Sequence, residues 1–129
     1  MSSLRADDVV KLARMKRVLV VDDNADAANS LAALLRAMGH EVFVAHEARA
    51  ALGDLSRIRP DIALLDIAMP GMSGYDLARQ IRNRMGAAVR MVALSGFGLP
   101  EDRARALEAG FDHHLVKPAD PAFLKSLLG

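Results

Sequence analysis

Short apolar runs alternate with longer amphipathic stretches along almost the whole chain. The runs predict five strands, over residues 18–21, 41–45, 61–65, 89–94 and 114–116. Leucine and alanine recur at helical spacing after each run, which predicts five helices, over residues 24–38, 47–58, 75–85, 100–109 and 121–128. A strand followed by a helix, repeated five times, predicts an α/β fold with parallel strands and helices on both faces of the sheet.

Residues 1–16 precede the first predicted strand and stand outside this alternation. Their apolar side chains fit one face of a helix: Leu4, Val9, Val10, Leu12 and Ala13. We interpret residues 1–16 as an N-terminal tail or linker helix, and we favour a partly ordered linker over a helix with a function of its own. Residues 17–129 are predicted to form a single domain.

Composition excludes several classes of protein. The formal net charge of +1 implies no general attraction to nucleic acid or to an anionic membrane surface. The chain has no cysteine, which excludes disulfides and thiolate chemistry. No apolar stretch approaches the ~18 residues of a membrane span, and the first residues lack the apolar core of a signal peptide. We therefore expect a cytoplasmic protein.

Polar side chains follow four of the predicted strands directly. They are the pair Asp22–Asp23, then Asp66, Ser95 and Lys117. Because ligands of open α/β sheets bind at the carboxyl ends of the strands, we expect these groups to lie together. Each has an ordinary explanation alone, as a helix cap, a turn residue or a surface lysine. Together they favour a metal-assisted site for phosphoryl chemistry.

This set of residues suits the transfer of a phosphoryl group. A carboxylate attacks phosphorus and holds the product as an acyl phosphate. Two unit charges about 4 Å apart repel by ~4 kcal/mol at an effective dielectric near 20, so three crowded carboxylates require a cation. Mg²⁺ prefers oxygen ligands and accepts one or two carboxylates while keeping several waters. Lys117 supplies a second cation, and Ser95 supplies a hydroxyl donor.

Four segments resemble the receiver domain of two-component response regulators. They are Val20–Asn24, Asp66 with Met69–Gly71, Ala93–Gly96 and Val116–Pro118. The likeness covers about residues 17–128. Within the family, the chain resembles the receivers of hybrid histidine kinases and the single-domain response regulators. It implies a doubly wound, five-stranded parallel sheet of the flavodoxin-like type.

The resemblance also implies a role for each matching residue. Asp66 would be the phosphoacceptor, and Lys117 and Ser95 would contact the phosphoryl group. Asp23 would bind Mg²⁺ directly and Asp22 mainly through water. Asp66 and the backbone carbonyl of Ala68 would complete the protein ligands.

A receiver of this kind would take its phosphoryl group from a phosphohistidine partner, either a histidine kinase or a histidine phosphotransfer protein. By analogy with the fold, Ala27, Ala28 and Leu31 on the first helix are candidates for contacting that donor. Phosphorylation would then change the affinity for a downstream protein. The chain is then no enzyme beyond its own phosphorylation and dephosphorylation. A stand-alone regulator and a receiver excised from a hybrid kinase are equally compatible with the sequence.

Some positions depart from the family pattern or lie outside the four matching segments. His114 occupies the position three residues before the lysine, where many receivers have Tyr or Phe as a switch residue. We slightly favour a plain surface histidine over a switch partner of Ser95. Phe97 and Ala68 flank the expected entrance for water and predict a long-lived acyl phosphate. The arginines from Arg79 to Arg84 are interpreted as a solvated helix face.

Two alternatives belong to other classes of protein. A magnesium-dependent phosphatase with an aspartyl nucleophile would need an acidic residue two positions after Asp66, where this chain has Ala68. A small flavin carrier would need a phosphate loop after the first strand, where the chain has the acidic stretch of residues 22–26.

Overall fold

The computed structural model describes residues 5–128. One five-stranded parallel sheet has the strand order β2-β1-β3-β4-β5. The strands are β1 (Arg17–Val21), β2 (Glu41–Ala45), β3 (Ile62–Asp66), β4 (Arg90–Ser95) and β5 (His113–Val116). The helices are α1 (Ala6–Arg14), α2 (Ala25–Ala37), α3 (Ala48–Ile58), α4 (Gly74–Met85), α5 (Pro100–Ala109) and α6 (Pro121–Leu128), with a 3₁₀ turn at Gly86–Ala88.

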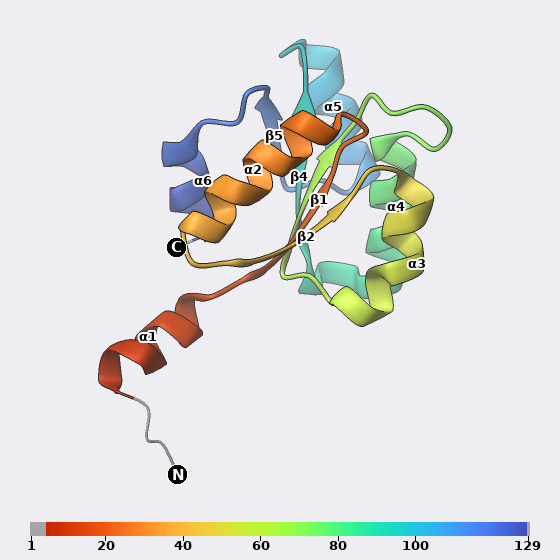
Figure 1. Ribbon diagram of the computed structural model, residues 1–129. Coiled ribbons are helices and arrows are strands. Elements are labelled where there is room, and N and C mark those ends of the chain that lie inside the picture. Colours follow the sequence, from red (N-terminus) through yellow and green to blue (C-terminus); the bar gives the residue numbers. More distant parts are fainter. Residues whose placement is uncertain (1–4, 129) are drawn as a thin grey trace.

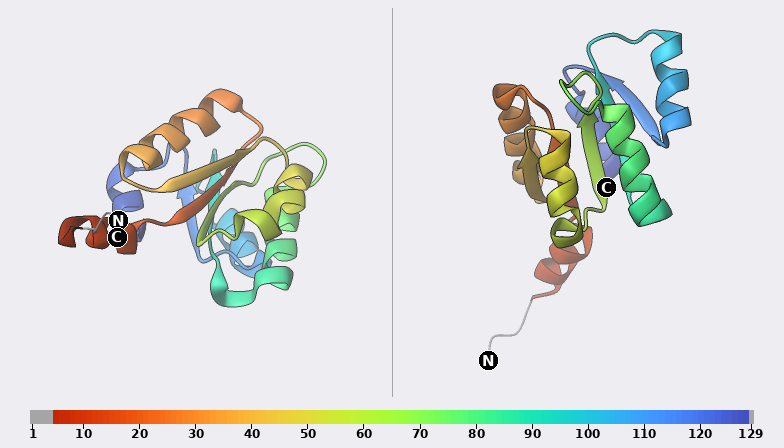
Figure 2. Two further views of the ribbon diagram at one scale, coloured as in Figure 1. Left: turned by 60° about the horizontal axis from the view of Figure 1, so that its bottom comes forward. Right: turned by 90° about the vertical axis from the view of Figure 1, so that its right-hand side faces the viewer.

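Helices cover both faces of the sheet (Figure 1; Figure 2). In β1, Val18 and Val20 pack with α2 and α6, whereas Leu19 and Val21 pack with α3, α4 and α5. All four side chains are fully buried, as expected for a parallel strand covered on both sides. The predicted fold, with its doubly wound parallel sheet, is confirmed.

The central strands are displaced by one residue from their predicted bounds. Asp66 is the last residue of β3 and pairs with Leu94, and Ser95 is the last residue of β4 and pairs with Val116. Apolar patterning predicted strand ends one residue earlier, because it cannot detect a polar residue that continues the ladder. As a result, both polar side chains are held by the sheet and not by the loops after it.

Helix α2 begins and ends where its capping residues require. The side-chain oxygen of Asn24 accepts a hydrogen bond from Ala27 N at 3.0 Å. After the helix, Gly39 has a φ of 97°, a left-handed conformation that glycine adopts without a steric penalty. The start of α2 is therefore fixed directly after the acidic pair.

Arg82 on α4 is a structural residue and not part of a solvated face, contrary to our interpretation. Its guanidinium donates to the carbonyl oxygen of Gly110 at 2.6 Å and of Val89 at 2.7 Å, and to Asp112 Oδ2 at 3.0 Å. Asp112 Oδ2 also accepts from Met91 N at 2.8 Å. Arg82 thus joins α4 to the segments that enter β4 and β5.

Helix α1 extends away from the sheet (Figure 1). Val9 and Val10 are exposed on it. Leu4 of the predicted amphipathic stretch lies outside the described residues, and so do the side chains of Leu12 and Ala13. The role of residues 1–16 stays a prediction. Among the described residues, no helix has the length and apolar character needed to cross a membrane.

Candidate functional site

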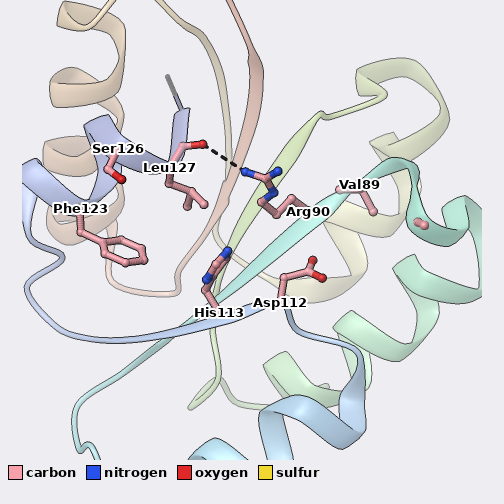
Figure 3. Close-up of a pocket in the computed structure, with 8 residues that line it drawn as sticks. Val89, Arg90, Asp112, His113, Phe123, Ser126 and Leu127 are labelled. Carbon is pink, nitrogen blue, oxygen red and sulfur yellow. Dashed lines mark hydrogen bonds between the residues drawn. The ribbon is translucent and has the colours of Figure 1, made fainter.

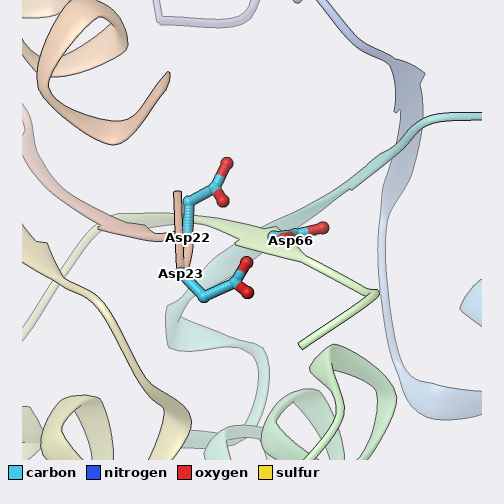
Figure 4. A group of neighbouring side chains, drawn as sticks. All are labelled: Asp22, Asp23 and Asp66. Atoms are coloured by element: carbon cyan, nitrogen blue, oxygen red, sulfur yellow. The ribbon is translucent and has the colours of Figure 1, made fainter. Parts of the chain in front are cut away.

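Three carboxylates meet at the carboxyl ends of β1 and β3. Asp22 follows β1 and Asp66 ends β3, and their exposed fractions are only 3% and 4%. Asp23, beside them, is exposed. One oxygen from each of the three lies within 4.8 Å of the others (Figure 4). Strand β1 lies between β2 and β3. The chain runs from β1 to β2 on one side and then crosses from β2 to β3 on the other, so the cluster occupies the switch point where such sheets bind ligands.

Backbone N–H groups hold the two buried carboxylates. Asn24 N donates to Asp22 Oδ1 at 3.0 Å, and Ala68 N donates to Asp66 Oδ1 at 3.2 Å. Gly74, at the start of α4, lies directly against the end of β3. A Cβ atom there would lie 2.3 Å from the carbonyl oxygen of Asp66, so only glycine permits this approach. The start of α4 and the end of β3 therefore form one tightly packed unit.

Lys117 brings a cation to the buried carboxylates. Its Nζ lies 2.8 Å from Asp22 Oδ2 and 3.4 Å from Asp66 Oδ1. Its backbone N donates to Ser95 O at 2.7 Å, and the Lys117–Pro118 peptide bond is cis. Burial alone would lower the pKa of Lys117. The hydrogen bond to Asp22 and the charge of Asp66 outweigh burial and raise the pKa, so the side chain is an ammonium.

The electrostatics of Asp66 differ from those of an ordinary surface carboxylate. Burial raises its pKa to about 6, although the N–H of Ala68 and the charge of Lys117 oppose that effect. The charge of Asp22 and a hydrogen bond with Asp23 contribute to the same rise. Lys117 therefore offsets only part of the effect of burial and charge repulsion, and the cluster has capacity for another cation.

Ser95 and His114 are in contact, so the interpretation of His114 as a plain surface histidine is wrong. Ser95 Oγ donates to the carbonyl oxygen of Phe97 at 2.5 Å and lies 3.0 Å from His114 Nε2. Ser95 is buried, and the His114 ring is half-buried. Burial first, and the charge of Arg103 second, lower the pKa of His114, so its ring is neutral at neutral pH.

A pocket of about 680 Å³ opens over these groups. Ala68 and Phe97 lie in its lining, and Phe97 is 73% exposed at the rim. Tyr75, Asp102 and Arg105 also line it, and Arg105 Cζ lies 4.4 Å from the centre of the Tyr75 ring. Sequence reasoning missed these three because they lie on α4 and α5, outside the polar strand ends.

The residues proposed for donor contact divide into two groups. Ala27 is exposed and Leu31 is half-buried, and both line a groove of about 390 Å³ beside Lys117. Ala28 lies on the face of α2 that packs against the sheet, and its side chain is fully buried. Ala28 therefore cannot contact a partner, and that candidate is corrected.

A second hollow lies at the opposite, amino end of the strands (Figure 3). Arg90 in this hollow donates to Leu127 O at 3.2 Å, and the His113 ring meets Phe123 edge-on. These contacts join α6 to the sheet. Arg90 and His113 thus both have partners on α6, so we assign the hollow to the packing of α6 and not to the chemistry at the carboxyl ends.

Comparison with known proteins identifies the family. Residues 18–128 match the family described as the response regulator receiver domain. The chain belongs to this family. The chain is 39% identical over 112 residues to an uncharacterised 14.6 kDa protein of Leptolyngbya boryana. The match covers 86% of this chain and 86% of that protein. The chain is also 40% identical over 104 residues to the sensory transduction protein RegX3 of Mycobacterium tuberculosis. That match covers 81% of this chain but only 45% of RegX3, so the chain spans about half the length of that relative.

Solved structures agree in fold. Chemotaxis protein CheY4 of Vibrio cholerae is 30% identical with a TM-score of 0.81, and the match covers 88% of this chain and 96% of the CheY4 chain. A CheY-like receiver from Methanospirillum hungatei is 28% identical with a TM-score of 0.81, covering 88% and 90% of the two chains. The resemblance read from the four sequence segments is confirmed, and the phosphatase alternative is not favoured.

Proposed function

We propose that this receiver domain accepts a phosphoryl group on Asp66 and changes its affinity for a protein partner as a result. The observation that carries the proposal is the convergence of Asp22, Asp23 and Asp66 with Lys117 at one end of the sheet. Asp66 is buried, lines the pocket and lies 3.4 Å from the lysine ammonium. A nucleophile for phosphorus and a cation for the transferred group are thus adjacent.

The cluster suits a magnesium ion. Its donors are oxygens, one from each of three carboxylates within 4.8 Å of one another, and Lys117 alone leaves the pKa of Asp66 raised. Asp23 and Asp66 would hold Mg²⁺ directly, with Asp22 acting mainly through water and the carbonyl of Ala68 as a further ligand. When bound, the ion would neutralise charge on the phosphoryl oxygens.

The protein's own groups perform the transfer. An Oδ atom of Asp66 forms a bond to phosphorus as the phosphorus–nitrogen bond of a phosphohistidine breaks, and the released imidazole keeps the electron pair of that bond. Lys117 pairs with a phosphoryl oxygen, and Ser95 donates its hydroxyl hydrogen to another. No general base is needed, because a carboxylate attacks without losing a proton.

The donor would be a histidine kinase or a histidine phosphotransfer protein. Ala27 and Leu31 lie beside Lys117 in one groove, which supports this face of α2 as the contact surface. The phosphorylated domain would act in the cytoplasm by binding a downstream protein, and it would not bind nucleic acid or a membrane directly. A stand-alone regulator and a segment of a hybrid kinase both fit, because the domain covers 45% of one curated relative and 86% of another.

Intact mass after incubation with a small acyl phosphate and Mg²⁺ tests the proposal. We expect one phosphoryl addition to the wild type and none to Asp66→Asn or to the wild type with a chelator. Asp54→Asn is a matched control, because Asp54 lies on α3, outside the site, and pairs with the exposed Arg57. Addition to Asp66→Asn, or addition that persists without a divalent cation, would contradict the proposal.

A further inference from the structure

The hydroxyl of Ser95 has two hydrogen-bond partners, and neither is Asp66. Ser95 Oγ has one hydrogen, which it donates to Phe97 O at 2.5 Å. At 3.0 Å from His114 Nε2, the same oxygen can therefore only accept. It follows that His114 carries its hydrogen on Nε2 and donates it to Ser95.

The other nitrogen of the ring is consistent with this tautomer. His114 Nδ1 is buried and has no hydrogen-bond partner among the residues that the structure describes. A hydrogen on Nδ1 would be a buried donor without an acceptor, which costs more than a bare lone pair there. Within residues 5–128, Ser95 is thus the one polar contact recorded for the ring, and the bond Nε2–H···Oγ orients both side chains.

We propose that His114 is a positioning residue that holds the Ser95 hydroxyl in its resting orientation, away from Asp66, through the bond from Nε2. This inference rests on the proposed function. It goes beyond a switch in which an aromatic ring merely fills the space that a hydroxyl vacates. A phenylalanine at position 114 has no donor and would leave Ser95 free of this restraint.

The two bonds connect the site to the surface of the domain. To donate to a phosphoryl group on Asp66, Ser95 must withdraw its hydrogen from Phe97 O and turn its oxygen away from His114. Phe97 is exposed, and a Cβ atom on the adjacent Gly98 would lie 2.9 Å from a Val116 methyl group at the end of β5. The turn of one hydroxyl therefore removes a hydrogen bond from a loop that is closely packed on β5.

The test measures affinity for beryllium fluoride, a phosphoryl mimic, at saturating Mg²⁺ by NMR titration of the full chain. His114→Phe and His114→Leu should bind it about three- to tenfold more tightly than the wild type. The net free energy of one hydrogen bond corresponds to a change of about this size in a binding constant. His114→Gln keeps an N–H donor and should stay within about twofold. His113→Phe is the matched control, because His113 lies on the same strand but faces Phe123 (Figure 3).

A double-mutant cycle separates positioning from a general effect of the ring. In a Ser95→Ala background, His114→Phe should leave the affinity unchanged, because the bond that it removes is already absent. A gain that persists in Ser95→Ala, a wild-type affinity in His114→Phe and His114→Leu, or a gain in His114→Gln equal to that of His114→Phe would each overturn the inference. Wild type that binds no beryllium fluoride would overturn the proposed function as well, so the two failures are distinguishable.

Discussion

At the scale of single residues, the electrostatics of Asp66 make a prediction about pH. Its pKa in the folded protein is about 6, against an ordinary 3.8, mainly because of burial. The folded state therefore binds this proton more tightly than the unfolded state does. The contribution of Asp66 to stability is favourable at low pH and is lost as pH rises from about 4 to about 6. Above that window the contribution is constant.

Thermal unfolding of metal-free protein, compared with Asp66→Asn, checks this prediction. We expect Asp66→Asn to become more stable than the wild type as pH rises through that window. The difference should reach on the order of 1–3 kcal/mol above pH 6, because a shift of one pKa unit is worth about 1.4 kcal/mol. Ionisable groups remote from the cluster titrate alike in both proteins and cancel. A difference that does not change with pH would show that the carboxyl is not perturbed.

We expect Ala68 to control how well water is oriented toward the acyl phosphate. It is exposed in the pocket lining and has no polar side chain, which supports a long-lived phosphoryl group. Ala68→Asn places an amide that can hold an attacking water, so we expect the phosphoryl half-life, followed by intact mass, to shorten about three- to tenfold. Phe97 is 73% exposed, so Phe97→Ala should change the half-life less. Equal half-lives for Ala68→Asn and the wild type would contradict this role.

At the scale of elements, α4 and β3 pack through Gly74. A Cβ atom at this position would lie 2.3 Å from Asp66 O and 2.6 Å from Ile67 Cα. Gly74→Ala must therefore push the helix from the strand, and we expect a loss of about 2–4 kcal/mol of unfolding free energy in urea titrations. Phosphorylation of Asp66 should be lost in parallel.

Gly53 provides the matched control for this change. It lies within α3, is exposed, and has no atom within 4 Å of an added Cβ. Gly53→Ala should raise the unfolding free energy by about 0.5–1 kcal/mol, because alanine has the higher helix propensity. If both substitutions had the same sign, the close approach at Gly74 would not be the cause.

At the scale of the whole molecule, we expect the acidic cluster to link metal binding to folding. Because a preformed site exists only in the folded state, Mg²⁺ should stabilise the domain by about 2.7 kcal/mol at a concentration 100 times its dissociation constant. Melting temperature measured against Mg²⁺ concentration should rise for the wild type and for Asp54→Asn. It should not rise for Asp23→Asn or Asp66→Asn. A rise shared by all four proteins would indicate a general effect of salt.

Local periodicity was sufficient to predict most of the fold. Runs of apolar residues and helical repeats of leucine identified the five strands and the five helices that follow them, because burial on both faces imposes those patterns. The strand ends at Asp66 and Ser95 were each misplaced by one residue, since hydrophobicity stops there although the ladder continues. Helix α1 was only one of two interpretations of residues 1–16.

The sequence by itself determined the order of strands and helices, and with it which polar residues come at the carboxyl ends of the parallel strands. Only the tertiary structure decided what those residues and their neighbours touch. Arg82 reaches Gly110 across 28 positions, Ala28 turns inward, and His114 meets Ser95 across 19 positions. The physical reason is that such contacts depend on the packing of segments far apart in the chain, which a local pattern does not encode.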